Sequence, residues 1–198
     1  MPMATTIRRN SMTMITTIKM QIELKKIAEP QQLEYIRELY ISAFPAKERR
    51  EFDELKLLLA DDDCFIFQLI TESGTLAGFC IIWEFSNFVF IEHFAIEPGL
   101  RGLRIGEKTL SVIRTQFQKN VILETELPSD EISNRRIRFY ERNGFHKLNR
   151  TYIQPSYGSN KPEVELKLMS TNVDIPVDEL DSIIQLIRKK VYGVEQAQ

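Results

Sequence analysis

The sequence predicts an α/β domain of the α+β type, in which helices flank a mixed, mainly antiparallel sheet and an extra helix follows at the C-terminal end. Stretches with period-two alternation and stretches with helical spacing follow one another in the order β-α-α-β-β-β-α-β-α-β-β-α. The turn Glu72-Ser73-Gly74-Thr75 separates two apolar runs and indicates an antiparallel hairpin. Residues 171–198 are expected to form an amphipathic helix that packs on the domain, followed by a short tail.

Composition narrows the class of protein. The chain has 198 residues, of which 43% are hydrophobic and 27% charged, enough for one domain with a buried core. A formal net charge of -2 and a pI near 5.8 do not favour nucleic acid as a partner. No apolar run approaches the roughly 18 to 20 residues that span a bilayer. We therefore expect a cytoplasmic protein with neither a nucleic-acid nor a membrane partner.

The two cysteines, Cys64 and Cys80, lie inside apolar, strand-like runs. This placement favours buried free thiols over a disulfide, and the spacing of the two residues does not indicate a metal site. No metal is therefore expected.

The first residues differ from the rest of the chain. Residues 1–19 contain three basic and no acidic side chains and show little periodicity. They are expected to form a disordered extension, a floppy tail or an over-long start, although a targeting peptide has a similar composition. The folded domain is expected to span residues 20–170.

The first half of the chain predicts two helices among four strands. Apolar residues recur at helical spacing over 33–44, and Pro45 ends that helix. A second helix is expected over 47–60, before an acidic break. The strands are expected near 21–27, 64–70, 76–85 and 88–96.

The second half predicts three helices and three strands. A helix follows Gly106, and another spans 134–142, where Asn143-Gly144 takes the position of a left-handed C-cap. Strands are expected over 121–127, 145–153 and 164–169. The apolar face of the last helix consists of Leu180, Ile183, Ile184, Ile187 and Val191.

A basic, glycine-containing loop joins the strand over 88–96 to the helix after Gly106. Such a loop presents unpaired N–H groups and the positive end of the helix dipole, so it binds a diphosphate with little help from side chains. The loop therefore indicates a phosphorylated ligand.

Two motifs carry a resemblance to a known family. RGLRIG follows a strand that ends in FAIEP, and NRRIRFYERNGF follows a strand that contains ETE. Together they resemble the GNAT superfamily of acetyl-CoA-dependent N-acetyltransferases over residues 21–170. The resemblance implies acetyl-CoA as the co-substrate.

The resemblance also implies which residues bind acetyl-CoA. Phe94, Ala95 and Ile96 would end a splayed strand whose backbone pairs with the pantetheine arm. The loop would cradle the diphosphate, and Asn134 would lie near the cofactor or simply cap its helix. The loop residues are Arg101, Gly102, Leu103, Arg104, Ile105 and Gly106.

One loop residue departs from the family pattern. Arg101 and Gly106 match it, whereas Arg104 stands where the family has its first glycine. The side chain of Arg104 either crowds the phosphate through its Cβ or turns outward and adds a charge-assisted contact.

Two residues are predicted to be catalytic. Tyr140 matches the family tyrosine that donates a hydrogen bond to the CoA sulfur, although a core aromatic at this position is the alternative. Glu92 is the candidate general base, because alternation points its carboxylate toward an apolar face, where burial raises its pKa. His93 is then expected on the opposite face, as a structural residue.

Two more carboxylates share one face of the next strand. Glu124 and Glu126 are expected to bind the ammonium group of the acceptor or to relay its proton, and surface or ion-paired carboxylates are an equal alternative. His146 is expected to be structural.

These observations predict an enzyme that transfers acetyl from acetyl-CoA to a primary amine by direct attack in a ternary complex. The acceptor is a small-molecule amine or a peptide amine. Two other classes stay open. One is a catalytically silent CoA-binding sensor, and the other is a protein-interaction module whose C-terminal helix docks on a partner or on a second subunit in a homodimer.

Overall fold

The computed structural model of this protein describes residues 21–158 and 160–194. The predicted disordered extension over 1–19 and the end of the predicted tail lie outside these residues. The domain boundaries at 20–170 and 171–198 stay a prediction.

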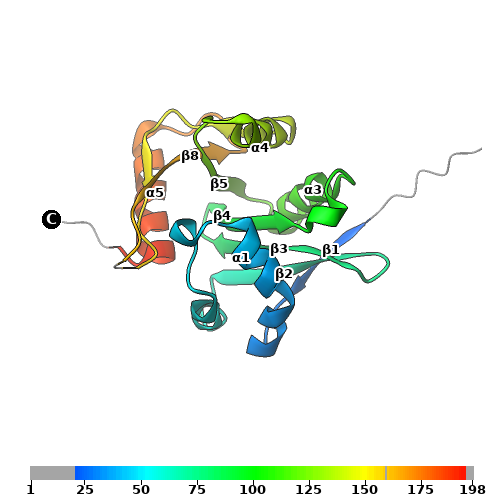
Figure 1. The fold of residues 1–198 in the computed structure, drawn as a ribbon. Helices are drawn as coiled ribbons and strands as arrows, with labels where there is room; N and C mark the ends of the chain where they lie inside the picture. The colour runs from blue at the N-terminus through cyan, green and yellow to red at the C-terminus, as the bar shows by residue number, and fades with distance from the viewer. Residues whose placement is uncertain (1–20, 159, 195–198) are drawn as a thin grey trace, which may run out of the picture.

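Eight strands form one sheet in the order β1-β2-β3-β4-β5-β8-β6, with β7 also paired to β8 (Figure 1). Only β4 and β5 are parallel. Among the described residues every other strand pair is antiparallel, which confirms the mixed, mainly antiparallel sheet. The strands are β1 Ile22–Lys26, β2 Cys64–Thr71, β3 Leu76–Glu84, β4 Phe88–Ile96, β5 Asn120–Glu126, β6 His146–Lys147, β7 Tyr152–Gln154 and β8 Val164–Ser170.

Five α-helices accompany the sheet within the described residues. They are α1 Arg37–Ala43, α2 Leu55–Leu58, α3 Ile105–Phe117, α4 Glu131–Arg142 and α5 Val177–Tyr192. Short 3₁₀ segments lie at Pro30–Ile36, Ala46–Glu48, Phe52–Glu54 and Pro98–Leu100. Figure 1 shows α5 at the side of the molecule where β8 lies and α3 at the side where β1 lies.

Four predicted elements differ from the structure. The helix expected over 33–44 is the 3₁₀ segment Pro30–Ile36 followed by α1. The helix expected over 47–60 is two 3₁₀ turns and the short α2, because Arg49 is extended and Arg50 turns inward to Glu92. The single strand expected over 145–153 is the separate pair β6 and β7. The helix expected over 134–142 begins three residues earlier, because the Asp130 side chain accepts the Ser133 N–H at 2.7 Å and caps it.

Hydrophobic residues form one core on each face of the sheet. Alternation along β4 sends Phe88 and Phe90 to the core beneath α1, α2 and α5. It sends Val89 and Ile91 to the core beneath α3 and α4. Each fully buried large apolar side chain contributes about 1.5–3 kcal/mol, so both helical layers are fixed by burial.

The last helix is part of the first core. Leu180, Ile183, Ile187 and Val191 are buried there, and Ile184 packs at its edge, which confirms the predicted apolar face. Gly193 ends the helix in the left-handed region at φ 68°. The predicted C-cap at Gly144 is also left-handed, at φ 80°. Both cysteines are buried and free, as predicted.

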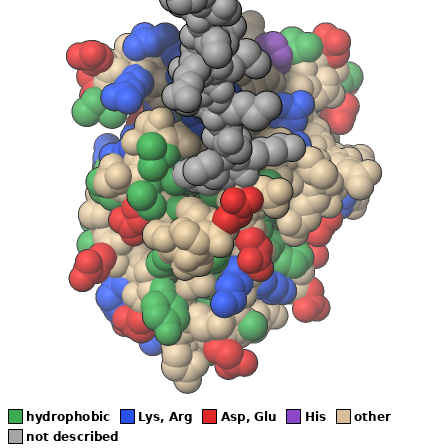
Figure 2. Space-filling view, turned by 90° about the vertical axis from the view of Figure 1, so that its right-hand side faces the viewer, with side chains coloured by type: hydrophobic (Ala, Val, Ile, Leu, Met, Phe, Trp, Pro, Cys, Tyr) green, Lys and Arg blue, Asp and Glu red, His purple; other side chains and the backbone are tan. Residues whose placement is uncertain are grey.

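Charges on the surface are mixed. On the face that Figure 2 shows, basic and acidic side chains are interspersed. No helix within the described residues is both long and apolar enough to cross a membrane.

Candidate active site

The two parallel strands separate before they end. Pairing between β4 and β5 runs only from Phe88 opposite Asn120 to Ile91 opposite Leu123. Beyond these pairs β5 continues along β8, whereas the second half of β4 has no strand on that side among the described residues. The backbone of 92–96 is therefore open to an extended ligand. Phe94, Ala95 and Ile96, the residues expected to pair with pantetheine, lie in this half.

A β-bulge lies where the strands separate. On β3, Ile81 is opposite His93 and Ile82 is opposite Ile91, so Glu92 is the extra residue. Glu92 and His93 consequently lie on the same side of the sheet, where the His93 ring is 4.3 Å from the ring of Phe44. The prediction that His93 points to the opposite face is wrong, because strict alternation does not hold across a bulge. Burial lowers the pKa of His93 to about 4, which keeps its ring neutral.

Glu92 is a buried, ion-paired carboxylate. Arg50 Nε donates to Oε1 of Glu92 at 3.2 Å, Trp83 Nε1 to Oε2 at 2.6 Å, and the Tyr157 hydroxyl to Oε1 at 2.8 Å. Burial alone would raise the pKa of Glu92, but the Arg50 charge and these hydrogen bonds outweigh it and hold the pKa below its usual value. The predicted rise in the pKa of Glu92 is therefore wrong, since the strand pattern could not reveal Arg50.

Glu124 has the opposite electrostatic environment. It is the first β5 residue beyond the paired segment, and the hydroxyls of Tyr152 and Tyr192 donate to its carboxylate, Tyr192 at 2.9 Å. Burial and the nearby charges of Glu92 and Glu48 raise the pKa of Glu124 to about 8 despite these donors. A carboxylate that titrates near neutrality can accept and release a proton at physiological pH.

Glu126, the other carboxylate on that face, is ion-paired with Arg136 of α4. Both side chains are partly exposed. The pair corresponds to the ion-paired alternative that the sequence left open for this position.

These carboxylates line one pocket of about 60 Å³. Its walls come from α1 and the turn after it, from the middle of β4, from the end of β5, and from β7, β8 and α4. The lining residues are Ala43, Phe44, Pro45, Glu48, Glu92, Glu124, Thr125, Glu126, Arg136, Gln154 and Leu166. The sequence-predicted carboxylates thus lie around one pocket beside the opening between β4 and β5.

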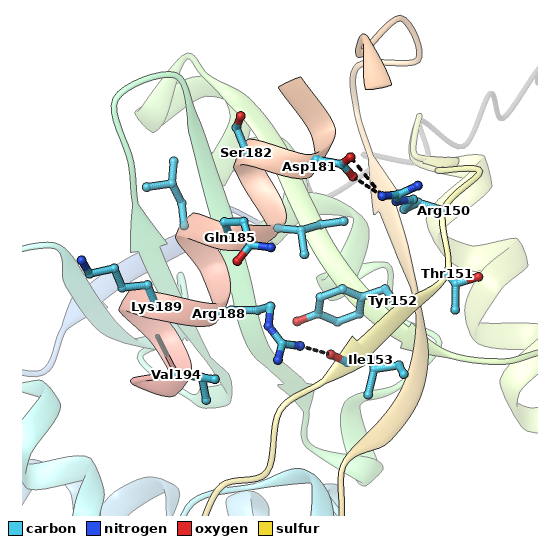
Figure 3. A pocket seen from close by; sticks show the side chains of 12 residues that line it. Arg150, Thr151, Tyr152, Ile153, Asp181, Ser182, Gln185, Arg188, Lys189 and Val194 are labelled. Atoms are coloured by element: carbon cyan, nitrogen blue, oxygen red, sulfur yellow. Dashed lines mark hydrogen bonds and ion pairs between the residues drawn. The ribbon is translucent and has the colours of Figure 1, made fainter. Parts of the chain in front are cut away.

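A larger open hollow lies between β7 and α5 (Figure 3). It contains none of the predicted site residues. The described part of the chain also has no group of three or more His, Cys, Asp or Glu residues arranged to hold a metal.

The loop before α3 has an unusual residue at its turn. Arg104 is the N-cap of α3 and has left-handed backbone angles, φ 60° and ψ 17°. A glycine would adopt this conformation without strain, which explains the glycine of the family pattern. The Arg104 side chain turns outward and donates to Glu107 at 2.9 Å. The outward turn agrees with the second alternative from the sequence, and the contact with phosphate that this alternative included stays a prediction.

The remaining loop residues leave room at the helix start. Nothing lies within 4 Å of a Cβ built on Gly102, so the loop is open there. A Cβ on Gly106 would meet the Phe139 ring at 3.0 Å, so α3 and α4 pack closely at this glycine. Leu103 is exposed, and Ile105, the first residue of α3, is buried. Arg101 Nε donates to the Ile96 carbonyl at 3.1 Å, which ties the loop to the end of β4.

Asn134 and Tyr140 come from α4. Asn134 lies inside the helix and donates to the Asp130 carbonyl at 2.7 Å, so the alternative that Asn134 is the N-cap is wrong. Tyr140 is buried in the core beneath α3 and α4, with its ring 5.7 Å from that of Phe145. Burial raises the pKa of Tyr140 to about 12, so its hydroxyl stays protonated at neutral pH.

Several partners of the carboxylates were not found from the sequence. Arg50 is 42 residues from Glu92, Tyr157 is 65 residues from it, and Tyr192 is 68 residues from Glu124. Local patterns carry no information on such distant pairs. The only available signal was a tyrosine at the end of the apolar face of the last helix, where a hydroxyl has to find a buried partner.

Comparisons with known proteins agree with this geometry. The model of the Acetyltransferase (GNAT) family matches residues 33–145, more than half of the chain. The chain belongs to the GNAT acetyltransferase family. No curated protein is a significant match to the sequence.

Solved GNAT structures share the fold. A GNAT-family protein from Bacteroides thetaiotaomicron superposes with a TM-score of 0.78 at 28% identity, covering 88% of this chain and 99% of that one. A spermidine N-acetyltransferase variant from Vibrio cholerae has a TM-score of 0.56 at 17% identity, with 76% and 92% covered. The ribosomal-protein alanine N-acetyltransferase from Escherichia coli has a TM-score of 0.54 at 19% identity, with 79% and 96% covered.

Proposed function

We propose that this GNAT-family enzyme transfers an acetyl group from acetyl-CoA to a primary amine by direct attack in a ternary complex. The observation that carries the proposal is the opening between β4 and β5 with an acidic pocket beside it. The open strand edge suits an extended acyl donor, and the pocket suits a cationic acceptor. The two substrates would meet where the strands diverge.

The residues around the opening fit acetyl-CoA. The backbone of Phe94 to Ile96 would pair with the pantetheine arm, as in the addition of a strand to a sheet. The first N–H groups of α3 and the loop from Arg101 to Gly106 would bind the diphosphate, with Gly102 leaving the space open. Asn134, which is half-buried on α4, would contact the cofactor from the side.

Glu124 is the better candidate for the general base. The ammonium group of a primary amine has a pKa of roughly 10, so an ordinary carboxylate is a poor acceptor for its proton. A carboxylate with a pKa of about 8 reduces that mismatch by several pKa units. Glu92, which the sequence suggested, is ionised and occupied by Arg50, Trp83 and Tyr157. We assign it the role of holding the acceptor side of the site together.

Tyr140 would assist the leaving group. The acceptor gives one proton to Glu124, and its nitrogen then attacks the thioester carbon to form a tetrahedral intermediate. The C–S bond breaks as the amide forms, and the thiolate accepts a hydrogen bond from the Tyr140 hydroxyl. The nitrogen loses its second proton as the amide forms, and the thiolate takes up one proton to leave as the free thiol of CoA. No covalent enzyme intermediate is needed, and both cysteines are buried away from the pocket.

The family comparisons support an amine acceptor. The Vibrio cholerae protein is a spermidine N-acetyltransferase, and the Escherichia coli protein acts on an alanine of a ribosomal protein. Both a small-molecule amine and a peptide amine are therefore acceptors on which this fold acts.

Calorimetry and a thiol-release assay test the proposal together. Titration with acetyl-CoA should show binding, and a panel of alkylamines, polyamines and short peptides should include acceptors that release CoA. Binding without release from any amine would favour a silent CoA-binding module. Absence of binding would contradict every CoA-dependent function and favour an interaction module.

A further inference from the structure

Gln154 is a buried amide with one polar atom unused. Its residue is 2% exposed, and it lines the acidic pocket. Its Nε2 donates to the Tyr192 hydroxyl at 3.3 Å, whereas its Oε1 has no partner among the described residues. A buried oxygen without a donor is costly, by about 1–3 kcal/mol, unless a ligand supplies the missing hydrogen bond.

The strand that carries Gln154 points it toward the pocket. In β7, Tyr152 lies opposite Leu166 and Gln154 opposite Val164 of β8, so these two side chains share one face. Both are buried, and the residue between them, Ile153, is 44% exposed on the other face. Tyr152 donates to Glu124, so the inner face of β7 faces the candidate base.

Helix α5 keeps β7 in that place. Arg188 donates to the Ile153 carbonyl at 3.1 Å, and Arg150, just before β7, pairs with Asp181 at 2.8 Å (Figure 3). The last residue of the helix, Tyr192, then reaches the pocket. Its hydroxyl accepts from Gln154 and donates to Glu124 at 2.9 Å, so one oxygen sets the spacing between the amide and the carboxylate.

We propose that Gln154 binds the ammonium group of the acceptor, and that Tyr192 positions Gln154 and Glu124 for this contact. The inference rests on the proposed acetyl transfer and names the acceptor class. An ammonium group has three N–H donors, and the residues that line the pocket include three with acceptor oxygens for them, the amide of Gln154 and the carboxylates of Glu124 and Glu48. After one proton passes to Glu124, Gln154 and Glu48 still accept the other two N–H groups.

The size of the pocket restricts the carbon next to that nitrogen. An apolar cavity of about 150 Å³ holds benzene, and this pocket has about 60 Å³. Scaled by that comparison, the pocket has room for an ammonium group and one methylene, so we expect a carbon that carries two further substituents to meet the walls. The acceptor class is therefore a primary amine on a CH₂ group, such as an alkylamine, a polyamine or a lysine side chain, and not a peptide N-terminus.

Steady-state kinetics with propylamine at saturating acetyl-CoA tests the role of Gln154. Gln154→Leu should raise the KM for propylamine at least about tenfold, because a hydrogen bond to a charged group is lost. Its KM for acetyl-CoA should stay within about twofold. Gln185→Leu, the same change at an exposed position on α5, is the matched control and should leave both values unchanged. An unaltered KM for propylamine in Gln154→Leu would overturn the assignment.

Two further measurements keep the test decisive. Gln154→Glu keeps the shape and the acceptor oxygen but removes the donor to Tyr192, so its KM for propylamine should lie well below that of Gln154→Leu; a KM as high as in the leucine variant would contradict the role of Oε1. Isopropylamine, which is branched next to nitrogen, should show a kcat/KM at least about tenfold below that of propylamine; equal values would contradict the acceptor class. If the wild type releases no CoA with any amine, the proposed function is contradicted. The role of Gln154 is then tested separately by calorimetry, which compares the binding of propylamine to the wild type and to Gln154→Leu. Equal binding would contradict that role.

Discussion

At the scale of single residues, two glutamates on adjacent strands take opposite roles because of their neighbours. Glu92 has a guanidinium and two neutral donors around it, and its pKa lies below the usual value. Glu124 has two tyrosine hydroxyls and other carboxylates around it, and its pKa rises to about 8. The sequence identified both residues but could not assign these roles, because Arg50 is distant in sequence and its approach depends on the fold.

Glu92→Gln tests the structural role of that carboxylate. It leaves the half-buried Arg50 guanidinium without its charged partner, so the free energy of unfolding at pH 7 should fall by about 3 kcal/mol. Because the folded-state pKa of Glu92 is depressed, its contribution exists above the unfolded pKa and is lost as the pH falls through the folded value. The difference between variant and wild type should therefore shrink below about pH 4.

Denaturant unfolding monitored by the fluorescence of Trp83, the single tryptophan, measures this difference. The indole donates directly to Glu92, so its emission reports on the site. Removing the Glu92 charge should also lower the pKa of Glu124. Of the other groups around Glu124, Glu48 raises this pKa, and Tyr152 and Tyr192 lower it. A variant as stable as the wild type at pH 7 would contradict the account of Glu92.

Arg104→Gly tests the strain at the start of α3. Arg104 holds a left-handed backbone that glycine adopts freely, so the variant should raise the Tm by about 2–4 °C. Arg104→Ala is the control, because it also removes the contact with Glu107 but retains the Cβ. Differential scanning calorimetry compares the two. An equal rise in both variants would mean that the side-chain contact, and not the backbone, sets the stability here.

At the scale of elements, periodicity predicted which stretches form strands and helices but not where the chain is interrupted. The alternation in β4 and the apolar face of α5 follow from local sequence and agree with the structure. The bulge at Glu92 and the broken helix over 47–60 do not, because both accommodate the contact between Glu92 and Arg50. The C-terminal helix also has a role that its amphipathic pattern did not indicate, since Tyr192 enters the candidate site.

Ile187→Ala tests how strongly α5 is anchored. Ile187 is completely buried in the core beneath α5, and its truncation should lower the free energy of unfolding by about 2–5 kcal/mol. Leu186→Ala, one residue earlier and 48% exposed, is the matched control and should change it by less than about 0.5 kcal/mol. Chemical denaturation of both variants measures the two values. Similar small effects would show that α5 is not part of the cooperative core.

At the scale of the whole molecule, the sheet separates the two substrates of the proposed reaction. The loop before α3 and Tyr140 of α4 lie with the core on one face, where we place the acyl donor. Glu92, Glu124 and Gln154 lie with α1 and α5 on the other face, where we place the acceptor. The opening where β4 and β5 diverge lies between the two faces, and we expect the transferred acetyl group there.

The pH dependence of acetyl transfer, compared between wild type and Glu124→Gln, tests this account most directly. CoA release from acetyl-CoA is measured with propylamine between pH 5.5 and 9.5. The base must be ionised to accept a proton, so kcat/KM of the wild type should rise with pH and level off above about pH 8. Glu124→Gln should lower kcat/KM at least about 100-fold and lose this rise, while calorimetry shows unchanged binding of acetyl-CoA. A variant that keeps both the rate and the rise would contradict the assignment of Glu124, and a wild type that binds acetyl-CoA but never transfers its acetyl group would contradict the proposed enzyme.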